Sequence, residues 1–344
     1  MITIDGNQGE GGGQILRTSL FFSLVLGEEV RVEKIRAKRE NPGLRPQHLA
    51  AIRAFAEVTG GEVENAKVGA SWIRFRPSDK AKGETTIEVG TAGSVTLILQ
   101  SLLPAVALAG RRASVKVKGG TDTKWSPTYE YFKRVFEPAA NAMGLRISTR
   151  LLRRGYYPIG GGLVEGTAHP SEVVEEKDFC LPPTKRAGTI VSVSSNLRRD
   201  VVKRQCGAAR EALETRGVEV EATEAREEEA NSPGSSVLVY RTEPDRCYFG
   251  GDAIGERGLP AESVGRAAAR IFLATLDSGA SVDPHLADML VPLMAFSKRA
   301  RLLTDRETPH LTTNLAVAKA FTGCDFYLQR AGRLCEVIVA GRRR

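Results

Sequence analysis

Histidine is the scarcest residue type here that can do chemistry near pH 7, and the 344-residue chain contains four. A neutral imidazole can act as a nucleophile, a general base or a metal ligand. His48 and His310 each follow a proline by one or two residues, at the predicted starts of two helices. A helix start attracts anions and disfavours a charged imidazole, so both are candidates for chemistry on a phosphate group.

The other two histidines have different surroundings. His285 precedes Asp288 by three residues on a predicted helix, so the two side chains lie on one side of it. This spacing is compatible with an ion pair at the helix start and with contact to a nucleotide and its metal ion, and both interpretations stay open. His169 has no charged partner close to it in the sequence, which favours a structural role.

Basic residues precede the first of these helix starts. Arg36, Arg39 and Arg45 come before Gln47, which adjoins His48. Guanidinium groups beside a helix start would form a strong anion site, because both present positive charge to the same ligand.

A glycine-rich turn, residues 9–14, lies between a predicted strand and a predicted helix, where its backbone N–H groups could hold an anion. It is not a dinucleotide-binding motif, because Gln14 replaces the third glycine, and the chain has no Walker A motif. A tight turn without ligand is the alternative. The spacing of Glu10, Gln14 and Arg17 would place them on one side of the helix start, which favours a functional role.

The elements that must position these residues follow one pattern three times. Each copy is predicted as β-α-β-α-β-β. The first has strands at 2–4, 30–35, 62–68 and 71–76 and helices at 14–26 and 46–60. The second has strands at 85–89, 114–118 and 145–157 and helices at 95–108 and 127–143. The third begins with a strand at 163–167 and resumes with helices at 284–296 and 312–321, a strand at 300–304 and a hairpin at 326–339.

The interruption of the third copy predicts a separate small domain, β-α-β-β-α, with strands at 189–194, 218–222 and 237–240, helices at 200–216 and 261–276, and an acidic loop at 224–229. The expected domains are therefore a catalytic part, 1–183 and 279–344, and an inserted α/β domain, 184–278. The fold class is mixed α/β, with the three repeats in a pseudo-threefold arrangement. The insert's self-contained pattern favours a module that nucleotide chemistry does not require.

The net charge of +8 is unevenly distributed. Residues 184–276 hold 14 basic and 14 acidic residues, so the rest of the chain holds 35 basic against 27 acidic. Two segments, 31–53 and 111–134, concentrate the excess. By charge alone, a phosphate-rich partner and a solvated surface explain these segments equally well.

Composition excludes several classes of protein. The chain is 42% hydrophobic and 26% charged, as in ordinary globular proteins. Its five cysteines have no paired framework and no C-x-x-C spacing, which predicts a reducing environment and no zinc site. No apolar run approaches the ~18 residues of a membrane helix, and the first six residues predict a strand and turn rather than a signal peptide. We therefore expect a cytoplasmic protein.

Taken together, the motifs resemble those of the RNA 3′-terminal phosphate cyclase family over nearly the whole chain. The segments that carry this resemblance are Gly9-Glu10-Gly11-Gly12-Gly13-Gln14-Ile15-Leu16-Arg17-Thr18-Ser19, the stretch from Arg36 to Leu49, Gly119-Gly120-Thr121-Asp122, Tyr157-Pro158-Ile159-Gly160-Gly161-Gly162, His285-Leu286-Ala287-Asp288 and His310-Leu311-Thr312-Thr313-Asn314. The family fold is similar to the predicted one, with three repeats and an inserted domain.

The resemblance implies an ATP-dependent ligase that converts RNA 3′-phosphate ends to 2′,3′-cyclic phosphates, with Mg²⁺ or a similar divalent cation. A histidine takes AMP from ATP, AMP passes to the RNA 3′-phosphate, and the 2′-hydroxyl displaces it. His310 matches the nucleophile. The positions matching the nucleotide site are Gln100, Pro127, His285, Leu286, Ala287, Asp288 and Met289. Those matching the cluster at the RNA end or the phosphates are Glu10, Gln14, Arg17, Arg36, Arg39, Gln47 and His48. The resemblance names no metal ligands and no oligomeric state.

One departure from the family pattern is Met289, which stands where a glutamine is usual and puts a base or ribose contact in question. Two other functions remain. One is a non-catalytic RNA-binding paralogue in ribosome biogenesis, a class that lacks the nucleophilic histidine. The other is an enzyme like the enolpyruvyl transferases, which share a repeated architecture. His310 disfavours the first of these functions, and the His310 motif together with the two basic segments disfavours the second.

Overall fold

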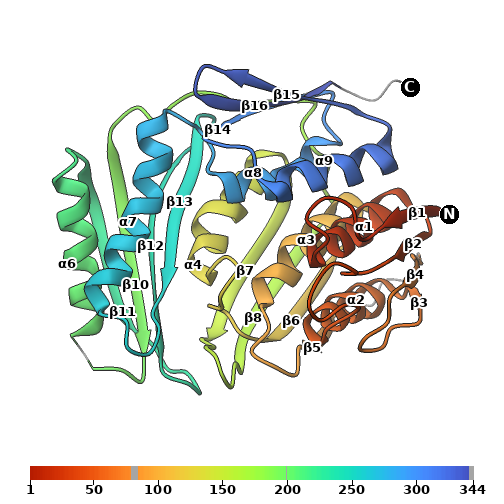
Figure 1. Cartoon of the computed structure of the whole chain (residues 1–344), viewed down its shortest axis with the longest axis horizontal. Coiled ribbons are helices and arrows are strands. Elements are labelled where there is room, and N and C mark those ends of the chain that lie inside the picture. The colour runs from red at the N-terminus through yellow and green to blue at the C-terminus, as the bar shows by residue number, and fades with distance from the viewer. Residues whose placement is uncertain (79–83, 199, 341–344) are drawn as a thin grey trace.

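The chain forms four mixed four-stranded sheets with helices packed between and beside them, as seen in a computed structural model that describes residues 1–78, 84–198 and 200–340 (Figure 1). Three sheets share one strand order: β1-β2-β4-β3, β5-β6-β8-β7 and β9-β14-β16-β15. In each, the first two strands are parallel and the last two form an antiparallel hairpin. The three predicted β-α-β-α-β-β repeats are therefore present.

The element bounds follow the predicted pattern closely in the first two repeats. The first contains β1 Ile2–Asp5, α1 Gly13–Leu26, β2 Val30–Glu33, α2 Pro46–Thr59, β3 Glu62–Glu64 and β4 Ile73–Arg76. The second contains β5 Glu84–Glu88, α3 Val95–Leu108, β6 Ala113–Gly119, α4 Tyr129–Tyr131, a π-helical turn Phe132–Phe136, α5 Glu137–Ala142, β7 Arg146–Arg153 and β8 Gly162–His169. Gly27 and Gly60 end α1 and α2 in the left-handed conformation (φ 69° and 67°), which glycine adopts without strain.

One strand was assigned to the wrong repeat. The sequence pattern makes residues 163–167 the first strand of the third repeat, but β8 pairs with β6 and β7 and so completes the second sheet. The third repeat instead begins at β9 Glu176–Phe179, which pairs in parallel with β14. Its other elements are α8 Pro284–Met294, β14 Arg299–Thr304, α9 Pro309–Thr322, β15 Asp325–Ala331 and β16 Leu334–Ala340.

The segment between β9 and α8 forms the fourth sheet with two helices on one face (Figure 1). Its elements are β10 Ala187–Ser195, α6 Val201–Glu214, β11 Glu219–Glu227, β12 Gly234–Glu243, β13 Cys247–Ile254 and α7 Ala261–Ser278. It has one strand more than predicted, β13, and most of the expected acidic loop belongs to β11. We refer to residues 184–278 as the insert.

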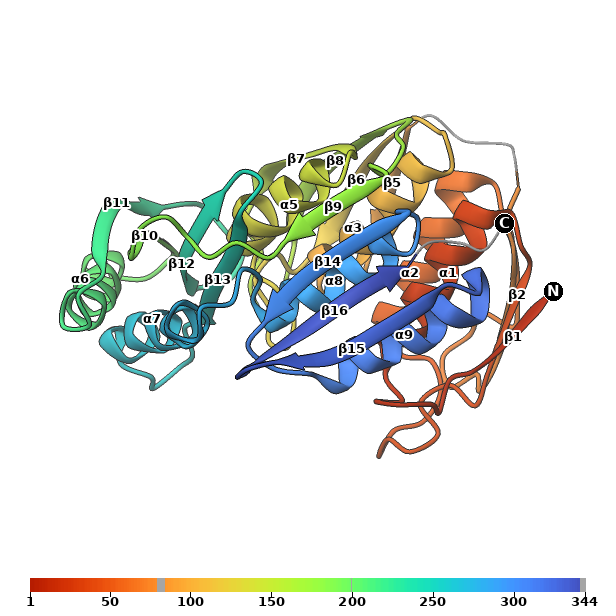
Figure 2. The same ribbon diagram turned by 90° about the horizontal axis from the view of Figure 1, so that it is seen from above.

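Helices of the three repeats pack against one another, and their sheets surround them (Figures 1 and 2). Phe22 of α1 stacks on Phe321 of α9, with ring centroids 5.5 Å apart, and on Phe296 at 5.8 Å. One hydrophobic cluster runs through all three repeats, while a second one lies between α6, α7 and the sheet of the insert. In the described part of the chain, no helix combines the length and apolar character needed to cross a membrane.

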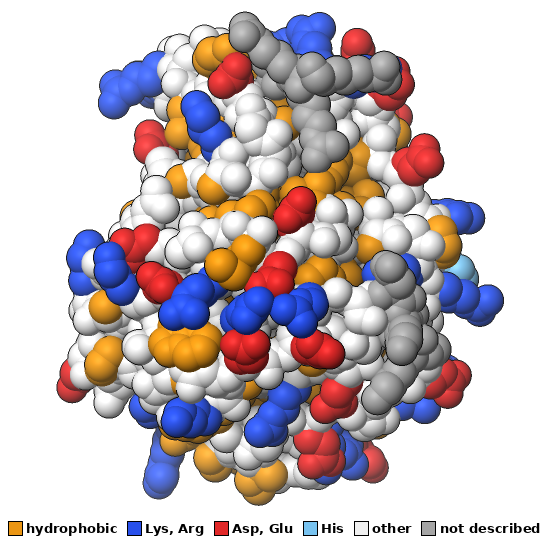
Figure 3. Space-filling model, turned by 90° about the vertical axis from the view of Figure 1, so that its right-hand side faces the viewer, with side chains coloured by type: hydrophobic (Ala, Val, Ile, Leu, Met, Phe, Trp, Pro, Cys, Tyr) orange, Lys and Arg blue, Asp and Glu red, His pale blue; other side chains and the backbone are white. Residues whose placement is uncertain are grey.

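The outer face of the first sheet carries paired charges. Arg76 bonds Glu29 and Glu62, both at 3.1 Å, and Arg31 bonds Glu33 at 2.7 Å. Figure 3 shows this side of the molecule, where basic and acidic side chains alternate and apolar ones are scattered. Part of the basic segment 31–53 is therefore a solvated, ion-paired surface.

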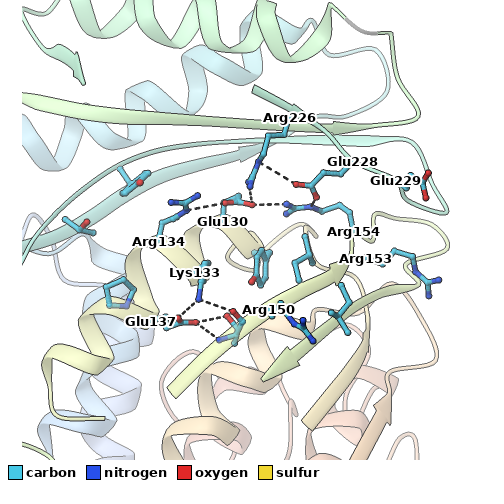
Figure 4. A pocket seen from close by; sticks show the side chains of 17 residues that line it. Glu130, Lys133, Arg134, Glu137, Arg150, Arg153, Arg154, Arg226, Glu228 and Glu229 are labelled. Carbon is cyan, nitrogen blue, oxygen red and sulfur yellow. Dashed lines mark hydrogen bonds and ion pairs between the residues drawn. The ribbon is translucent and has the colours of Figure 1, made fainter. Parts of the chain in front are cut away.

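The insert is joined to the second repeat through a buried arginine. Arg154 has no exposed side-chain surface and bonds Asp122 at 3.1 Å, Glu130 at 2.8 Å and Glu228 of the insert at 3.0 Å. Ser236, also in the insert, donates a hydrogen bond to Asp122 at 2.9 Å. Figure 4 shows Arg154, Arg226 and Arg134 arranged around the Glu130 carboxylate.

We expect Arg154→Met to lower the free energy of unfolding by about 3–5 kcal/mol, because the buried carboxylates of Asp122 and Glu130 lose the cation that they share, and the bond to the partly exposed Glu228 is lost as well. The matched control is Arg150→Met, whose side chain is 71% exposed and pairs with Glu165. That change should cost less than about 1 kcal/mol. Chemical denaturation of both variants measures the difference, and equal losses would contradict this role for Arg154.

Candidate functional site

The glycine-rich turn lies where the first and third repeats meet. A Cβ atom on Gly9 would collide with the Thr313 hydroxyl of α9, and one on Gly13 would collide with the His48 imidazole of α2. The N–H of Glu10 donates to the Thr313 hydroxyl at 3.1 Å. Only glycine therefore allows this turn to approach both helices so closely. Because α1 begins at Gly13, Glu10 lies in the turn rather than on the predicted helix face.

His48 is buried, and its imidazole is neutral. Its Nδ1 accepts the backbone N–H of Arg45 at 3.0 Å, so the neutral ring carries its proton on Nε2, the atom that faces Gly13. Burial lowers the pKa of His48 to about 3, and nearby arginines act in the same direction. With Nδ1 occupied and Nε2 protonated, His48 has no free lone pair for attack.

His310 has a different environment. The helix α9 begins at Pro309, three residues before the predicted start, so His310 lies inside its first turn, which Thr308 caps by accepting the N–H of Leu311. The imidazole is partly exposed, and its buried Nδ1 lies 3.4 Å from the Glu10 carboxylate without a hydrogen bond. Burial lowers the pKa of His310, as do Arg17, His285 and Arg39, whereas Glu10 raises it. His310 is thus a neutral imidazole at a positively polarised helix end.

Guanidinium groups surround this imidazole on one side. Arg39 forms an ion pair with the Glu10 carboxylate and also donates to the Glu10 carbonyl at 3.1 Å. The Nε atoms of Arg17 and Arg36 are buried and have no hydrogen-bond partner. Burial lowers the pKa of Arg17 to about 10 and also lowers that of Arg36. Unused donors and uncompensated positive charge are what an anionic ligand would satisfy.

On the opposite side, the site is acidic. Asp288 of α8 is buried and accepts the Thr308 hydroxyl at 2.6 Å. Burial raises its pKa to about 7, although the bond from Thr308 and the charge of His285 oppose this. Asn314 donates to the Asp288 carbonyl at 2.6 Å and accepts the Thr18 hydroxyl at 2.8 Å, so it ties α8, α9 and α1 together.

A narrow cavity lies between these two sides. It brings together five of the residues selected from the sequence, which are Gln14, Arg17, Gln100, Asp288 and Met289. The Gln100 Oε1 atom is buried there without a hydrogen-bond partner. Residues predicted for the phosphates and residues predicted for the nucleotide therefore line a single cavity.

The remaining selected residues lie around this cavity or away from it. The Pro127 carbonyl accepts the Thr96 hydroxyl at 2.8 Å, one turn before Gln100 on α3. His285 is exposed at the start of α8, whereas Leu286 and Ala287 are fully buried and their N–H groups donate to Asp283. Gln47 is exposed, and its Cβ lies against Gly93 at the start of α3.

Pro127 also differs from the predicted helix start, since it precedes Thr128, the N-cap of α4. Thr313 and Asn314 belong to the His310 motif without a predicted role, and Thr308 precedes it, yet all three shape the site through hydrogen bonds. The available signal was the position of Thr313 and Asn314 three and four residues after His310, which places them on one face of a helix, and that of Thr308 directly before Pro309, where a cap residue is expected.

A larger cleft lies elsewhere. It has a volume of about 1010 Å³ and separates the second repeat from the insert (Figure 4). None of the selected residues lines it. Its basic side chains include Lys133, Arg134 and Arg226, which bond Glu137, Glu224 and Glu130. These cations belong to the basic segment 111–134 or to the insert, and their charge is already compensated.

Comparison with known proteins identifies the family of the chain. The family model for the RNA 3′-terminal phosphate cyclase matches residues 8–328. Archaeal relatives named RNA 3′-terminal phosphate cyclase include those of Pyrobaculum neutrophilum, 43% identical over 99% of this chain and 98% of the relative, and Pyrococcus furiosus, 42% identical over 94% of each. A third, from Thermococcus onnurineus, is 43% identical over 96% of each chain. The chain therefore belongs to the RNA 3′-terminal phosphate cyclase family.

Proposed function

We propose that this protein uses ATP to convert RNA 3′-phosphate ends into 2′,3′-cyclic phosphates through a covalent His310–AMP intermediate. The names of its relatives support the overall reaction. The observation that carries the mechanism is the neutral, partly exposed imidazole of His310 in the first turn of α9, beside arginines that have unused donors. This environment also disfavours a non-catalytic paralogue, because it presents a nucleophile rather than a mere binding surface.

In the first step, His310 attacks the α-phosphorus of ATP. The Glu10 carboxylate faces Nδ1 and so favours the proton there, which leaves the Nε2 lone pair for attack. The Nε2–phosphorus bond forms as the bond to the leaving pyrophosphate breaks. Glu10 stabilises the positive charge that develops on the ring, and the first-turn N–H groups of α9 face the phosphate.

In the next steps, an oxygen of the RNA 3′-phosphate attacks the phosphorus of the bound AMP, and the Nε2–phosphorus bond breaks. The oxygen of the neighbouring RNA 2′-hydroxyl then bonds to the 3′-phosphorus as the bond from that phosphorus to the bridging oxygen breaks. AMP leaves with the bridging oxygen, and the hydroxyl proton passes to water. Arg36 and Arg39 would neutralise the charge on the RNA end, and Arg17 that on the triphosphate.

A divalent cation would be held mainly by the phosphates of the substrate. Among the described residues no three His, Cys, Asp or Glu side chains are grouped to hold a metal ion. Mg²⁺, however, is commonly bound by one carboxylate together with substrate phosphates. The Glu10 Oε2 atom, which has no hydrogen-bond partner, faces Nδ1 of His310 at 3.4 Å and serves the imidazole, so we assign no protein ligand to the cation. A bound cation would offset charge on the leaving pyrophosphate.

We expect His310→Ala to fold and to bind ATP but to form no adduct with ATP labelled on the α-phosphate, because the attacking nitrogen is gone. His169→Ala is the matched control and should form the adduct. Wild-type protein should also make a phosphatase-resistant end on a 3′-phosphorylated oligoribonucleotide, and His310→Ala should not. A labelled adduct in His310→Ala, or one that maps to His48 or a lysine, would overturn the assignment.

The pH dependence of adduct formation should follow the His310 imidazole. Its pKa lies below the usual 6.5, so the ring is neutral above that pH and the rate falls only as the pH drops further. Glu10→Gln removes a charge that raises this pKa, so its acid limb should lie at lower pH than that of the wild type. Glu33→Gln, on the outer face of the first sheet, is the control. A limb that stays in place or moves to higher pH would contradict the proposal.

Arg39→Ala should lower kcat/KM for RNA by about 10- to 100-fold, the range expected for one lost hydrogen bond to a charged group. The ratio of wild-type to variant kcat/KM should decrease as the salt concentration rises, because a protein with one fewer phosphate contact depends less steeply on salt. Arg31→Ala, which alters a paired arginine in the same segment, should match the wild type. Steady-state kinetics at several salt concentrations measure this, and an unchanged KM for RNA would remove Arg39 from the site.

A further inference from the structure

The last strand of the insert uses its free edge to bind the catalytic part of the chain. β13 ends its sheet, and on its open side the N–H of Tyr248 donates to the Ser281 carbonyl at 2.8 Å. Two residues further on, the N–H of Gly250 donates to the Asp283 carboxylate at 3.0 Å. After two more residues, the Asp252 carboxylate accepts the N–H of Thr128 at 2.8 Å. Alternate residues of one strand thus contact the starts of α8 and α4.

The start of α8 depends on Asp283. One oxygen of this carboxylate accepts the N–H groups of His285 and Leu286, both at 3.0 Å, and so caps the helix. The Tyr131 hydroxyl donates to both oxygens at 2.8 Å. Because Asp283 is buried and fully used, the position of His285 is fixed by a network that includes the insert.

The start of α4 depends on Asp252 in the same way. Thr128 follows Pro127 directly, and its hydroxyl caps the helix by accepting the N–H of Tyr131 at 3.2 Å. The Asp252 carboxylate lies outside this helix and accepts the backbone N–H of Thr128. Burial raises the pKa of Asp252, although hydrogen bonds from Thr128 and the charge of His285 oppose this. A carboxylate buried in this way destabilises the fold unless its hydrogen bonds compensate for the lost hydration. Those hydrogen bonds then fix one local conformation.

We propose that Asp252, a residue of the insert, is a positioning residue for the nucleotide: it fixes Pro127 and, through Tyr131 and Asp283, His285. This inference rests on the proposed function in one respect, that these two residues contact the nucleotide. It makes the insert part of the nucleotide site, whereas its neutral charge and self-contained pattern favour an independent module.

The test measures binding of an ATP analogue with a methylene group between the α- and β-phosphates, which cannot transfer AMP. Full-length wild type, Asp252→Ala, Asp252→Asn and Glu228→Gln are compared by calorimetry well below their unfolding temperatures. Asp252→Ala should weaken binding by about tenfold or more, because the Thr128 N–H loses its acceptor. Asp252→Asn keeps an acceptor oxygen and should stay within about threefold of the wild type.

Glu228→Gln is the matched control, since Glu228 is an insert carboxylate that bonds the second repeat through Arg154 instead. It should lower the unfolding temperature without weakening analogue binding. If Asp252→Ala is less stable but binds like the wild type, or if Glu228→Gln loses affinity equally, the proposal is wrong. If the wild type binds the analogue but forms no adduct with ATP, the proposed reaction is wrong. The positioning role of Asp252 is then decided by the binding data alone.

Discussion

The absence of side chains at Gly9 and Gly13 is the constraint on which the site depends. The turn between β1 and α1 fits against Thr313 on one side and His48 on the other, with no space for a Cβ atom. This contact sets the distance between the first and third repeats. It therefore determines that Glu10 reaches the His310 imidazole and that Arg39 can pair with Glu10. A side chain in this turn would separate groups whose chemistry requires proximity.

The resulting site is electrically polarised. Arg17 and Arg36 present unused donors on the side of α1 and α2, while Asp288 lies buried on the side of α8. The cavity between them has a volume of only about 30 Å³, so what it shows is that the basic and the acidic side of the site meet at one place. The two histidines near the arginines differ for a local reason: a backbone N–H occupies Nδ1 of His48, whereas Nδ1 of His310 faces a carboxylate.

Much of the fold could be predicted from the sequence, because periodic apolar residues and the glycines that end helices are local signals. Helices α1, α2 and α3 were predicted almost to their bounds for that reason. The strand β8 was misassigned because a strand that follows three glycines has the same local pattern whether it ends one repeat or begins the next. β13 was missed because Gly250 and Gly251 interrupt its apolar pattern. The bond from Thr128 to Asp252 joins residues 124 positions apart, so no local pattern contains it.

The place of the insert in the chain explains how it can affect the site without altering the repeat. The insert leaves the third repeat after β9 and returns just before α8, and these two ends are adjacent, since the Ser281 hydroxyl bonds the carbonyl of Phe179 and its N–H bonds Leu303. The β9–β14 pairing therefore survives the insertion. The same connection, however, leads into the first turn of α8, where His285 lies. An insertion at this point necessarily packs its nearest strand beside that helix start, and the polar groups buried there must be satisfied by both parts of the chain. Asp283 meets this requirement by accepting hydrogen bonds from the insert, from α8 and from Tyr131. The start of α8 is therefore stabilised by the insert as well as by the repeats.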